Sequence, residues 1–442
     1  MIQLRDYQQT VYNDIRGAML AGHKRVLATL PCGAGKSYIM AKIAENCKGD
    51  VLILTHRREL LDQTGGLLRE NGIGARMSMI LTEANRLGQY PRPALVITDE
   101  AHLSRAQSWV NVLKYYDTYV VGFTATPVRL DGKPLGDIYD SLVTGLSVKE
   151  LIALNRLSPY EYYAPTAVDT DGLRKVAGDY VGKDLEKLMM DRAIYSDVLK
   201  SWKQIANGER TIAYCVSVKH AKQVCDMFND AGVTAAEVDG GTPSEIRSDI
   251  MRRFRAGEIT VLCNVGIISE GVSIDEVTCC LLLRPTESLA LYWQQGMRCM
   301  RYLPGKTAKI IDCVANYSRN PLFDMDIEWS LKHSVTKRER YTADGDFTLR
   351  RCPECFMVFK TAPVCPYCGH VYQLEQKELK KHEEIELQRI TKEQAEEAEK
   401  ERKRMRQEVG RARTLPELLA IAKERGYSPA WAYKMMQVRG RT

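Results

Sequence analysis

The chain has 442 residues, 45% of them hydrophobic and 27% charged, which is an ordinary composition for a globular protein. A chain of this length can bury two or three separate cores. Its formal net charge of +7 suits an anionic partner, but basic and acidic residues are interspersed, so charge alone selects no class of partner. The sequence has no apolar run long enough to cross a bilayer and no N-terminal signal-peptide pattern, so we expect no membrane partner.

The thirteen cysteines fall into two groups. Nine are scattered through apolar segments, and four form two close pairs near residue 360. This distribution favours a reducing compartment and a single metal site over a disulfide framework. We therefore expect a cytoplasmic protein.

Residues 1–148 alternate between apolar runs and helical patterns. Such alternation predicts a parallel sheet with helices on both faces and ligand-binding loops at the carboxyl ends of its strands. The expected strands cover residues 25–30, 51–55, 94–98 and 119–123, and the expected helices cover residues 36–46, 58–70 and 106–116.

A glycine-rich turn, Pro-Cys-Gly-Ala-Gly-Lys-Ser at residues 31–37, follows the first expected strand. Gly33 and Gly35 would let the backbone bend so that its N–H groups face phosphates. Lys36 would reach the β- and γ-phosphates, and the Ser37 hydroxyl would ligate magnesium (Mg2+). Leu30 stands where the G-x-x-x-x-G-K-[ST] pattern has its first glycine, so an ordinary glycine turn is the alternative for the loop taken alone.

An acidic tetrapeptide, Asp-Glu-Ala-His at residues 99–102, directly follows the expected strand at 94–98. An acidic pair at the carboxyl end of a buried strand is where P-loop ATPases hold magnesium and polarise the attacking water. We expect Asp99 to hold magnesium through a water molecule and Glu100 to act as general base or to orient that water. The loop and the acidic strand end, in this order, predict an ATP site.

The alternation begins again between about residues 205 and 335 and predicts a second α/β domain. Its expected strands cover residues 211–216, 235–238, 260–264, 278–283 and 309–313. We therefore expect one domain at residues 1–148 and another at 149–335, the second including a connector.

In this order the motifs resemble those of superfamily 2 helicases, and more narrowly of RadD-type DEAH-box proteins, across about residues 1–335. The resemblance implies two tandem RecA-like domains and a nucleic-acid-stimulated ATPase. It also implies roles for residues of the first domain. Gln8, whose amide both donates and accepts, would bind the N6/N7 edge of adenine, while a plain helix start capped by Asp6 is compatible with this role. Arg57 and Arg58, at a helix start, would contact backbone phosphates, with a solvated helix start as the alternative.

The same resemblance implies residues that couple the ATP site to the second domain. His102 would link the two, and the hydroxyls of Thr124 and Thr126 would bridge the state of ATP to domain closure, although a Thr/Pro turn closing a strand is the alternative. In the second domain, Ser217 and Asn264 would contact nucleic acid, and Gly271 would lie in the cofactor-binding coupling motif.

Two features of the second domain concern the coupling chemistry. Ser273 stands where the family has an aspartate two residues after Gly271, and Asp275 is a possible substitute. Gln294, Arg298 and Arg301 reproduce a Gln-x-x-x-Arg-x-x-Arg spacing, which would place both guanidiniums on one face of a helix. They would then neutralise charge on the transferred phosphoryl group as arginine fingers, with a solvated or salt-bridged face as the alternative.

Beyond the motor, two Cys-x-x-Cys pairs stand nine residues apart within a module at residues 345–374. Cys352, Cys355, Cys365 and Cys368 would hold zinc (Zn2+) with four thiolates, with iron in a rubredoxin-like site as the lesser possibility. RadD-type proteins are similar in carrying such a module. Residues 375–410 predict a charged, solvated spacer helix, and residues 411–442 predict a small basic helical tail with helices at 415–423 and 428–436.

Three functions are compatible with these residues. The first is an ATP-dependent helicase or translocase acting on single-stranded or branched DNA in repair, recombination or replication, with a partner protein bound through the C-terminal region. The second is an RNA helicase, and the third is an ATP-driven remodeller of protein–DNA complexes that separates no strands. Contacts to phosphate do not reveal the sugar, so stimulation of ATP hydrolysis by DNA or by RNA would separate the first two.

Overall fold

The computed structural model describes most of the chain, which forms two compact units at residues 1–372 and 373–442. The described residues are 1–56, 58–104, 106–129, 133–164, 175–176, 179–180, 186, 192–266, 274–332, 349–352, 354–355, 357–360, 362–371, 412, 414–424 and 436. Arg57, Gly271, the predicted spacer helix at 375–410 and all but Met436 of the predicted helix at 428–436 lie outside these residues.

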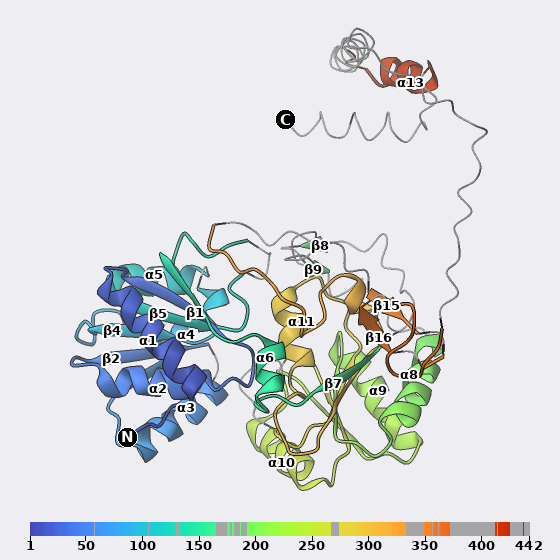
Figure 1. The fold of residues 1–442 in the computed structure, drawn as a ribbon, viewed down its shortest axis with the longest axis horizontal. Helices are drawn as coiled ribbons and strands as arrows, with labels where there is room; N and C mark the ends of the chain where they lie inside the picture. Colours follow the sequence, from blue (N-terminus) through green and yellow to red (C-terminus); the bar gives the residue numbers. More distant parts are fainter. Residues whose placement is uncertain are drawn as a thin grey trace. The chain divides into compact units, whose positions relative to one another are not determined.

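The first lobe is built on a six-stranded parallel sheet with the strand order β3-β2-β4-β5-β1-β6 (Figure 1). Its strands are β1 (Arg25–Thr29), β2 (Val51–Thr55), β3 (Arg76–Met79), β4 (Leu95–Thr98), β5 (Tyr119–Thr124) and β6 (Ser141–Thr144). Its helices are α1 (Asp6–Leu20), α2 (Lys36–Asn46), α3 (Arg58–Glu70), α4 (Ile80–Ala84), the 3-10 turn η1 (Ala101–Leu103) and α5 (Gln107–Tyr116).

Alternation of side chains along the strands builds the two faces of this sheet. In β1, Val26 and Ala28 belong to a core shared with α1 and α2, while Leu27 between them belongs to a core shared with α5. Successive side chains of a strand point to opposite faces, so a continuous apolar run can serve both cores. This is why the central strands of the first lobe are mostly apolar, with helices covering both faces.

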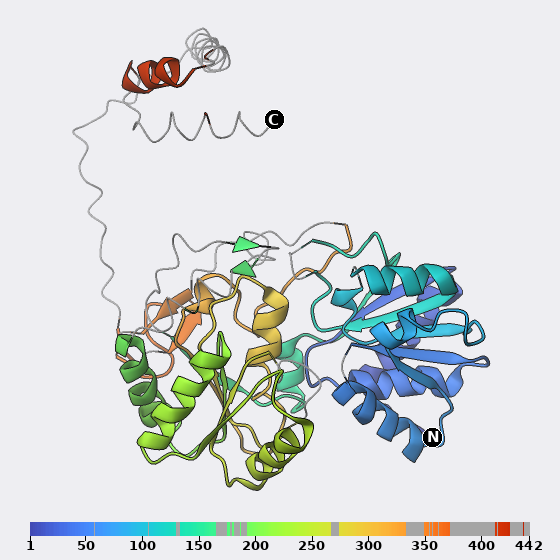
Figure 2. The same cartoon turned by 180° about the vertical axis from the view of Figure 1, so that it is seen from behind.

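The second lobe, which Figure 2 shows from behind, again has a sheet packed against helices. Its strand order is β11-β12-β10-β13-β14-β7, with parallel pairing. Its strands are β7 (Tyr160–Tyr163), β10 (Thr211–Tyr214), β11 (Ala235–Val238), β12 (Val261–Asn264), β13 (Cys279–Leu282) and β14 (Ala308–Asp312). Its helices are α8 (Arg192–Ile205), α9 (Val218–Asp230), α10 (Ser244–Ala256), α11 (Leu289–Gly296) and the 3-10 turn η2 (Asn316–Ser318), while α6 (Val148–Ala153) lies in the connector before β7.

Smaller elements complete the described chain. The hairpin of β8 (Lys175–Val176) and β9 (Asp179–Tyr180) follows β7, and β15 (Leu349–Arg351) pairs antiparallel with β16 (Val358–Lys360) in the four-cysteine module. This module lies beside the edge of the second sheet, because Met357 forms an antiparallel bridge with Tyr163 of β7. The tail unit contains α13 (Leu415–Glu424), close to the predicted helix at 415–423.

The predicted fold class, two parallel-sheet α/β domains, is confirmed. In the two six-stranded sheets, the strands missing from the prediction are β3, β6 and β7, each at the edge of its sheet. Their residues are only partly buried, since an edge strand is covered by fewer neighbours. They therefore lack the apolar run that identifies a central strand in a sequence.

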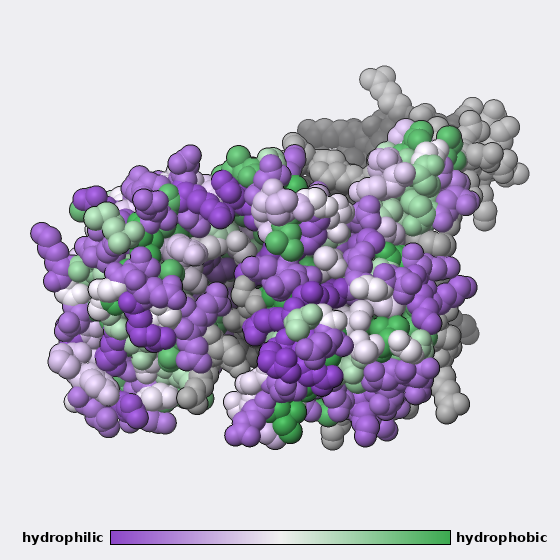
Figure 3. All heavy atoms as spheres, turned by 90° about the horizontal axis from the view of Figure 1, so that it is seen from below, coloured by the Kyte–Doolittle hydropathy of each residue, from purple (hydrophilic) through white to green (hydrophobic). Residues whose placement is uncertain are grey.

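The surface agrees with the hydropathy of the sequence. Among the described residues, no helix combines the length and the apolar character needed to cross a membrane. The face in Figure 3 is mostly hydrophilic, with apolar side chains in small scattered groups. Isolated apolar residues of this kind are normal on a protein surface.

Candidate functional site

A cavity of about 510 Å³ lies where the two lobes meet. Residues of both lobes and of the connector between them line this cavity. The lining residues are Gln3, Arg5, Gln8, Cys32, Gly33, Gly35, Lys36, Ser37, Tyr38, Leu60, Gln63, Asp99, Glu100, Asn155, Arg156, Asp275, Met297, Arg298, Arg301 and Tyr302. The structure thus brings the predicted phosphate loop, acidic pair and arginine pair to one cavity.

The glycine-rich loop has a backbone that only glycine adopts easily. Gly33 and Gly35 have φ angles of +85° and +80°. A Cβ atom on Gly35 would also lie 2.4 Å from Nε2 of Gln8, so this position has no room for a side chain. Gly35 caps α2, which begins at Lys36, and the free N–H groups at this helix start favour a bound anion.

Gln8 braces this loop from α1. Its Nε2 atom donates to the carbonyl oxygen of Ala34 at 3.0 Å, and the Tyr7 hydroxyl donates to the same oxygen at 3.0 Å. The Gln8 Oε1 atom accepts the N–H of Arg5 at 3.0 Å. The amide therefore holds the loop in place while it lines the cavity, and binding an adenine edge would require it to exchange these bonds.

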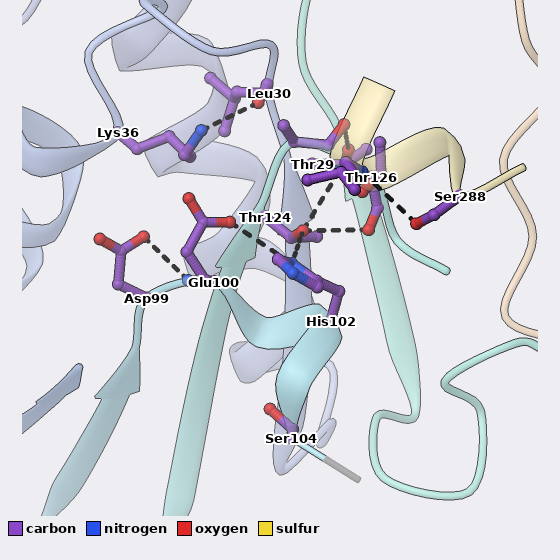
Figure 4. A network of polar contacts seen from close by, with 12 residues as sticks. Thr29, Leu30, Lys36, Asp99, Glu100, His102, Ser104, Thr124, Thr126 and Ser288 are labelled. Carbon is purple, nitrogen blue, oxygen red and sulfur yellow. Dashed lines mark hydrogen bonds and ion pairs between the residues drawn. The ribbon is translucent and has the colours of Figure 1, made fainter. Parts of the chain in front are cut away.

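The acidic pair is buried at the end of β4 (Figure 4). Glu100 has a left-handed backbone, with φ +50°, and its N–H donates to Oδ1 of Asp99 at 2.9 Å. Burial, and then the charge of Glu100, raise the pKa of Asp99 to about 6. Burial also acts against ionisation of Glu100, but the bond from His102 and the charge of Lys36 outweigh it and lower its pKa to about 2.

His102 connects the acidic pair to the end of β5 (Figure 4). Its Nδ1 atom lies 3.4 Å from Oε2 of Glu100 and 3.2 Å from the hydroxyl of Thr124. The Thr124 hydroxyl in turn donates to the carbonyl oxygen of Thr126 at 3.0 Å. The side chains of Glu100, His102, Thr124 and Thr126 are all buried. Because solvent does not screen these contacts, a change in the position or charge of Glu100 would affect its neighbours in the network.

The arginine pair reaches the cavity from a turn, and the prediction that both share a helix face is wrong. Helix α11 ends at Gly296, and Arg301 forms an antiparallel bridge with Leu157 of the connector. Arg301 also pairs with Asp275, whose Oδ1 lies 3.2 Å from Nη1. Burial, together with the charge of Arg298, lowers the pKa of Arg301.

The arginine turn contacts the phosphate loop closely. A Cβ atom on Gly33 would lie 3.0 Å from Cδ2 of Leu157 and 3.9 Å from Cγ of Arg301. The side chains of two segments from outside the first sheet therefore pack directly over this glycine. The connector also supplies Asn155 and Arg156 to the cavity, and no motif spacing indicated these two residues.

The predicted nucleic-acid residues of the second lobe lie at strand ends, but they differ in exposure. Ser217 is half-buried and caps α9, where its hydroxyl accepts the N–H of His220 at 3.2 Å. His220, which the sequence did not single out, accepts the Val216 N–H on Nδ1 at 3.2 Å and fixes this turn. Asn264 is completely buried at the end of β12. The side chain of Arg58 lies outside the described part of the structure.

The four cysteines of the C-terminal module form a compact cluster. Their sulfur atoms all lie within 4.8 Å of one another, and Sγ of Cys352 lies 3.5 Å from Sγ of Cys368. Four sulfurs around a tetrahedral metal at about 2.3 Å would be roughly 3.8 Å apart. The cluster therefore has the size and donor set of a tetrahedral metal site.

Two family models match the two lobes. The model described as "Type III restriction enzyme, res subunit" matches residues 1–86 and 75–129, and "Helicase conserved C-terminal domain" matches residues 192–303. Each match lies within one lobe. The residues of the cavity that come from the sheets of the two lobes thus fall within or beside matched segments.

Curated relatives cover the same region. A 51.5 kDa protein of a Lactococcus phage (isolate 7-9) is 37% identical over 332 residues, which are 74% of this chain and 73% of that protein. The putative ATP-dependent helicase IRC3 of Saccharomyces cerevisiae is 27% identical across 67% of this chain and 49% of its own length. The DNA 3'-5' translocase XPB2 of Sulfurisphaera tokodaii is 26% identical, with coverage of 64% and 75%. The chain thus spans about half the length of the yeast relative.

Among solved structures, a fragment of a putative HsdR subunit of a type I restriction enzyme from Vibrio vulnificus has the same fold. Its TM-score is 0.58 with 20% sequence identity, and the match covers 72% of this chain and 66% of that one. At this identity the likeness concerns the arrangement of the two lobes and their sheets.

The buried His220 generates a prediction about acid stability. Burial lowers its pKa to about 4, whereas an unfolded histidine titrates near 6.5. As pH falls from 6.5 to 4 the unfolded chain takes up a proton that the folded chain does not, so the stability falls by about 1.4 kcal/mol per pH unit. Urea unfolding across this range should show a shallower decline for His220→Asn. The exposed His23→Asn variant is the control, and an equal decline in both variants would contradict the prediction.

Proposed function

Because this chain belongs to helicase superfamily 2, we propose that it is an ATP-driven motor that moves along or unwinds DNA. The observation that carries the proposal is the cavity shared by the lobes. Lys36 and the acidic pair line it from one lobe, and Arg298 and Arg301 line it from the other. We assign the motor to residues 1–335, with domains at 1–148 and 149–335.

The first lobe supplies the groups suited to hold the phosphates of ATP. The backbone of Gly33 and Gly35 and the start of α2 would bind phosphate oxygens, and Lys36 would neutralise the β- and γ-phosphates. Asp99 and Ser37 are oxygen donors that line the cavity and fit magnesium, which would screen phosphate charge. The low pKa of Glu100 keeps it ionised, so that it can orient a water or accept its proton.

The second lobe supplies positive charge for the transferred phosphoryl group. Arg298 and Arg301 line the cavity from a turn of this lobe that follows α11. ATP that binds both sides would favour lobe closure, and loss of the γ-phosphate would weaken it. The contacts from Glu100 through His102 to Thr124 would carry this change to the end of β5.

Alternating closure becomes movement if each lobe also holds the nucleic acid. We propose Arg57 and Arg58 in the first lobe, and the turn at Ser217 with Asn264 in the second, as the segments that touch the strand. The burial of Asn264 favours a role in shaping its loop, with backbone groups nearby making the contact. Gly271 would complete the coupling motif.

DNA is the favoured substrate over RNA. The archaeal relative is named a DNA translocase, and the matched restriction-enzyme family supports the same substrate class. A role in repair, recombination or replication, and a RadD-type DEAH-box subclass, are our finer proposals. The four-cysteine module after the motor and the Asp-Glu-Ala-His strand end support that subclass.

Zinc is the metal we propose for the four-cysteine cluster, because thiolates in tetrahedral geometry favour it. The module spans residues 345–374. Met357 of the module forms a β-bridge with Tyr163 on the edge strand β7. By stabilising the module, the metal would also stabilise its packing on that sheet edge. A partner protein would bind through the C-terminal region.

Substitutions in the cavity test the ATPase assignment. Lys36→Ala and Glu100→Gln should each reduce ATP turnover at least about 100-fold, because they remove phosphate charge or the water-orienting group, and DNA binding should persist. Arg298→Ala should lower kcat far more than ATP affinity. Steady-state ATPase assays and filter binding measure these effects.

Two surface variants serve as matched controls for these substitutions. Lys48→Ala in the first lobe and Arg255→Ala in the second each remove an exposed charge away from the cavity, so both should hydrolyse ATP normally. A normal rate for Arg298→Ala would show that its finger role is wrong.

The choice of nucleic acid is tested by stimulation of hydrolysis. Single-stranded DNA should raise the ATPase rate at least about tenfold more than RNA of the same sequence, because the proposed motor engages DNA productively. A labelled strand released from a fork would then identify unwinding. Strong stimulation with no release from any fork or overhang would favour the remodeller, and equal stimulation by RNA would contradict the DNA assignment.

Metal removal tests the four-cysteine module. Purified protein should contain one zinc per chain by elemental analysis, and Cys352→Ser with Cys355→Ser should remove it. The loss should destabilise the motor by on the order of 2–4 kcal/mol, measured by urea unfolding, because the module covers β7. Cys47→Ser, at a half-buried cysteine of the first lobe, is the control. Iron in place of zinc would refute the assignment.

A further inference from the structure

Within the described residues, two segments run from one lobe to the other. The first crossing is the connector through α6 to β7. The second is residues 320–332, here called the strap, which leaves the second lobe after η2 and returns to the first. The carbonyl oxygen of Leu331 accepts the N–H of Gly136 at 3.0 Å, and the Leu331 side chain packs on the core beneath α5.

At the second-lobe end, the strap is fixed to the helix that precedes the arginine turn. Phe323 is completely buried and stacks on Tyr292 of α11, with ring centroids 4.6 Å apart. A Cβ atom on Gly296 would lie only 2.1 Å from Cζ of Phe323. The ring thus occupies the space of a side chain at the last residue of α11, two positions before Arg298.

The middle and the first-lobe end of the strap are also specific. Trp329 packs edge-on against Trp293 of α11, with centroids 5.9 Å apart. At Gly136, a Cβ atom would lie 2.3 Å from the carbonyl oxygen of Leu331, so strap and loop meet backbone to backbone. The strap therefore links α11 to the first lobe and packs closely at both of its ends.

The connector holds the same turn from the other side. The N–H of Ser158 donates to the carbonyl oxygen of Met300 at 2.8 Å, and its hydroxyl donates to that of Arg301 at 3.1 Å. The arginine turn is therefore held between these two segments, by the connector at Arg301 and by the strap through α11.

A second cavity, of about 490 Å³, lies beside the strap. It is bounded by Thr29, Pro31 and Ala125 of the first lobe and by Met325, Ile327 and Trp329 of the strap, among others. Between its two fixed ends, the strap thus borders open space. This space permits the lobes to change their separation while the ends stay attached.

We propose that the strap is a positioning element for the arginine turn, which makes the placement of Arg298 depend on the position of the first lobe. This inference rests on the proposed ATPase function and adds a second mechanical link to it. When ATP closes the lobes, the strap would hold the end of α11 in register with the phosphate loop. The strap touches none of the reacting groups itself, so it would act on kcat through Arg298.

Gly136→Ala detaches the first-lobe end, since its methyl group would meet the Leu331 carbonyl oxygen. The expected result is a kcat for DNA-stimulated hydrolysis about tenfold lower, with the KM for ATP within twofold of the original. Gly74→Ala is the matched control, because a Cβ atom there meets no atom within 4 Å, and it should behave as the unaltered protein. An unchanged kcat in folded Gly136→Ala would overturn the proposal.

Trp329→Ala provides a second test that leaves the loop at Gly136 intact. It should lower kcat in the same way, and Trp329→Phe should restore most of the rate because an aromatic edge can still pack on Trp293. Thermal unfolding followed by circular dichroism verifies that each variant is folded. A normal kcat in Trp329→Ala, or no rescue by Trp329→Phe, would count against positioning by the strap.

The double variant Gly136→Ala/Arg298→Ala distinguishes the role of the strap from the proposed arginine-finger role of Arg298. If the strap acts through Arg298, the double variant should be no slower than Arg298→Ala alone. Multiplied effects would show that the strap acts elsewhere and would overturn the inference. A normal rate for Arg298→Ala alone would instead remove the finger role on which the inference rests.

Discussion

Separation of charge between two lobes is the constraint on which the rest of the structure depends. The buried carboxylates of Asp99 and Glu100 belong to the first lobe, and the guanidiniums of Arg298 and Arg301 belong to the second. Within one rigid domain these groups could pair directly. Here Glu100 is stabilised by His102, and Arg301 pairs with Asp275 of its own lobe. A ligand with several negative charges is therefore suited to join the two sides.

Three glycines mark close contacts between segments around the site. The neighbouring atoms leave no room for a side chain at these three glycines. They are Gly35 beside Gln8, Gly296 beside Phe323 and Gly136 beside the strap. At each point the absence of a Cβ atom lets two segments approach to a distance that no other residue permits. The phosphate loop, the end of α11 and the strap are therefore located by backbone geometry, and the charged side chains extend from these fixed positions.

All the central strands were predictable, whereas β11 was the one predicted strand among the four edge strands of the two large sheets. The apolar runs at β1, β2 and β4 serve two cores at once, and such runs stand out in a sequence. The edge strand β7 has only part of its surface buried, and its tyrosines and glutamate carry no such signal. The glycine-rich loop and the acidic strand end were predicted because the chemistry proposed for them needs fixed residue types at short spacing. His220 and the connector residues Asn155 and Arg156 belong to no such pattern.

The sequence by itself determined the two α/β domains, the order of the phosphate loop, acidic pair and arginines, and the four-cysteine cluster. Each of these features depends on the periodicity or spacing of nearby residues. Local backbone geometry relates such a pattern directly to a helix, a strand or a turn. Only the tertiary structure decided that α11 ends before Arg298, that Asp275 pairs with Arg301 and that the strap returns to Gly136. The last of these contacts joins residues nearly two hundred positions apart. All three features depend on how whole sheets and helices pack together, and short residue spacings do not encode that packing.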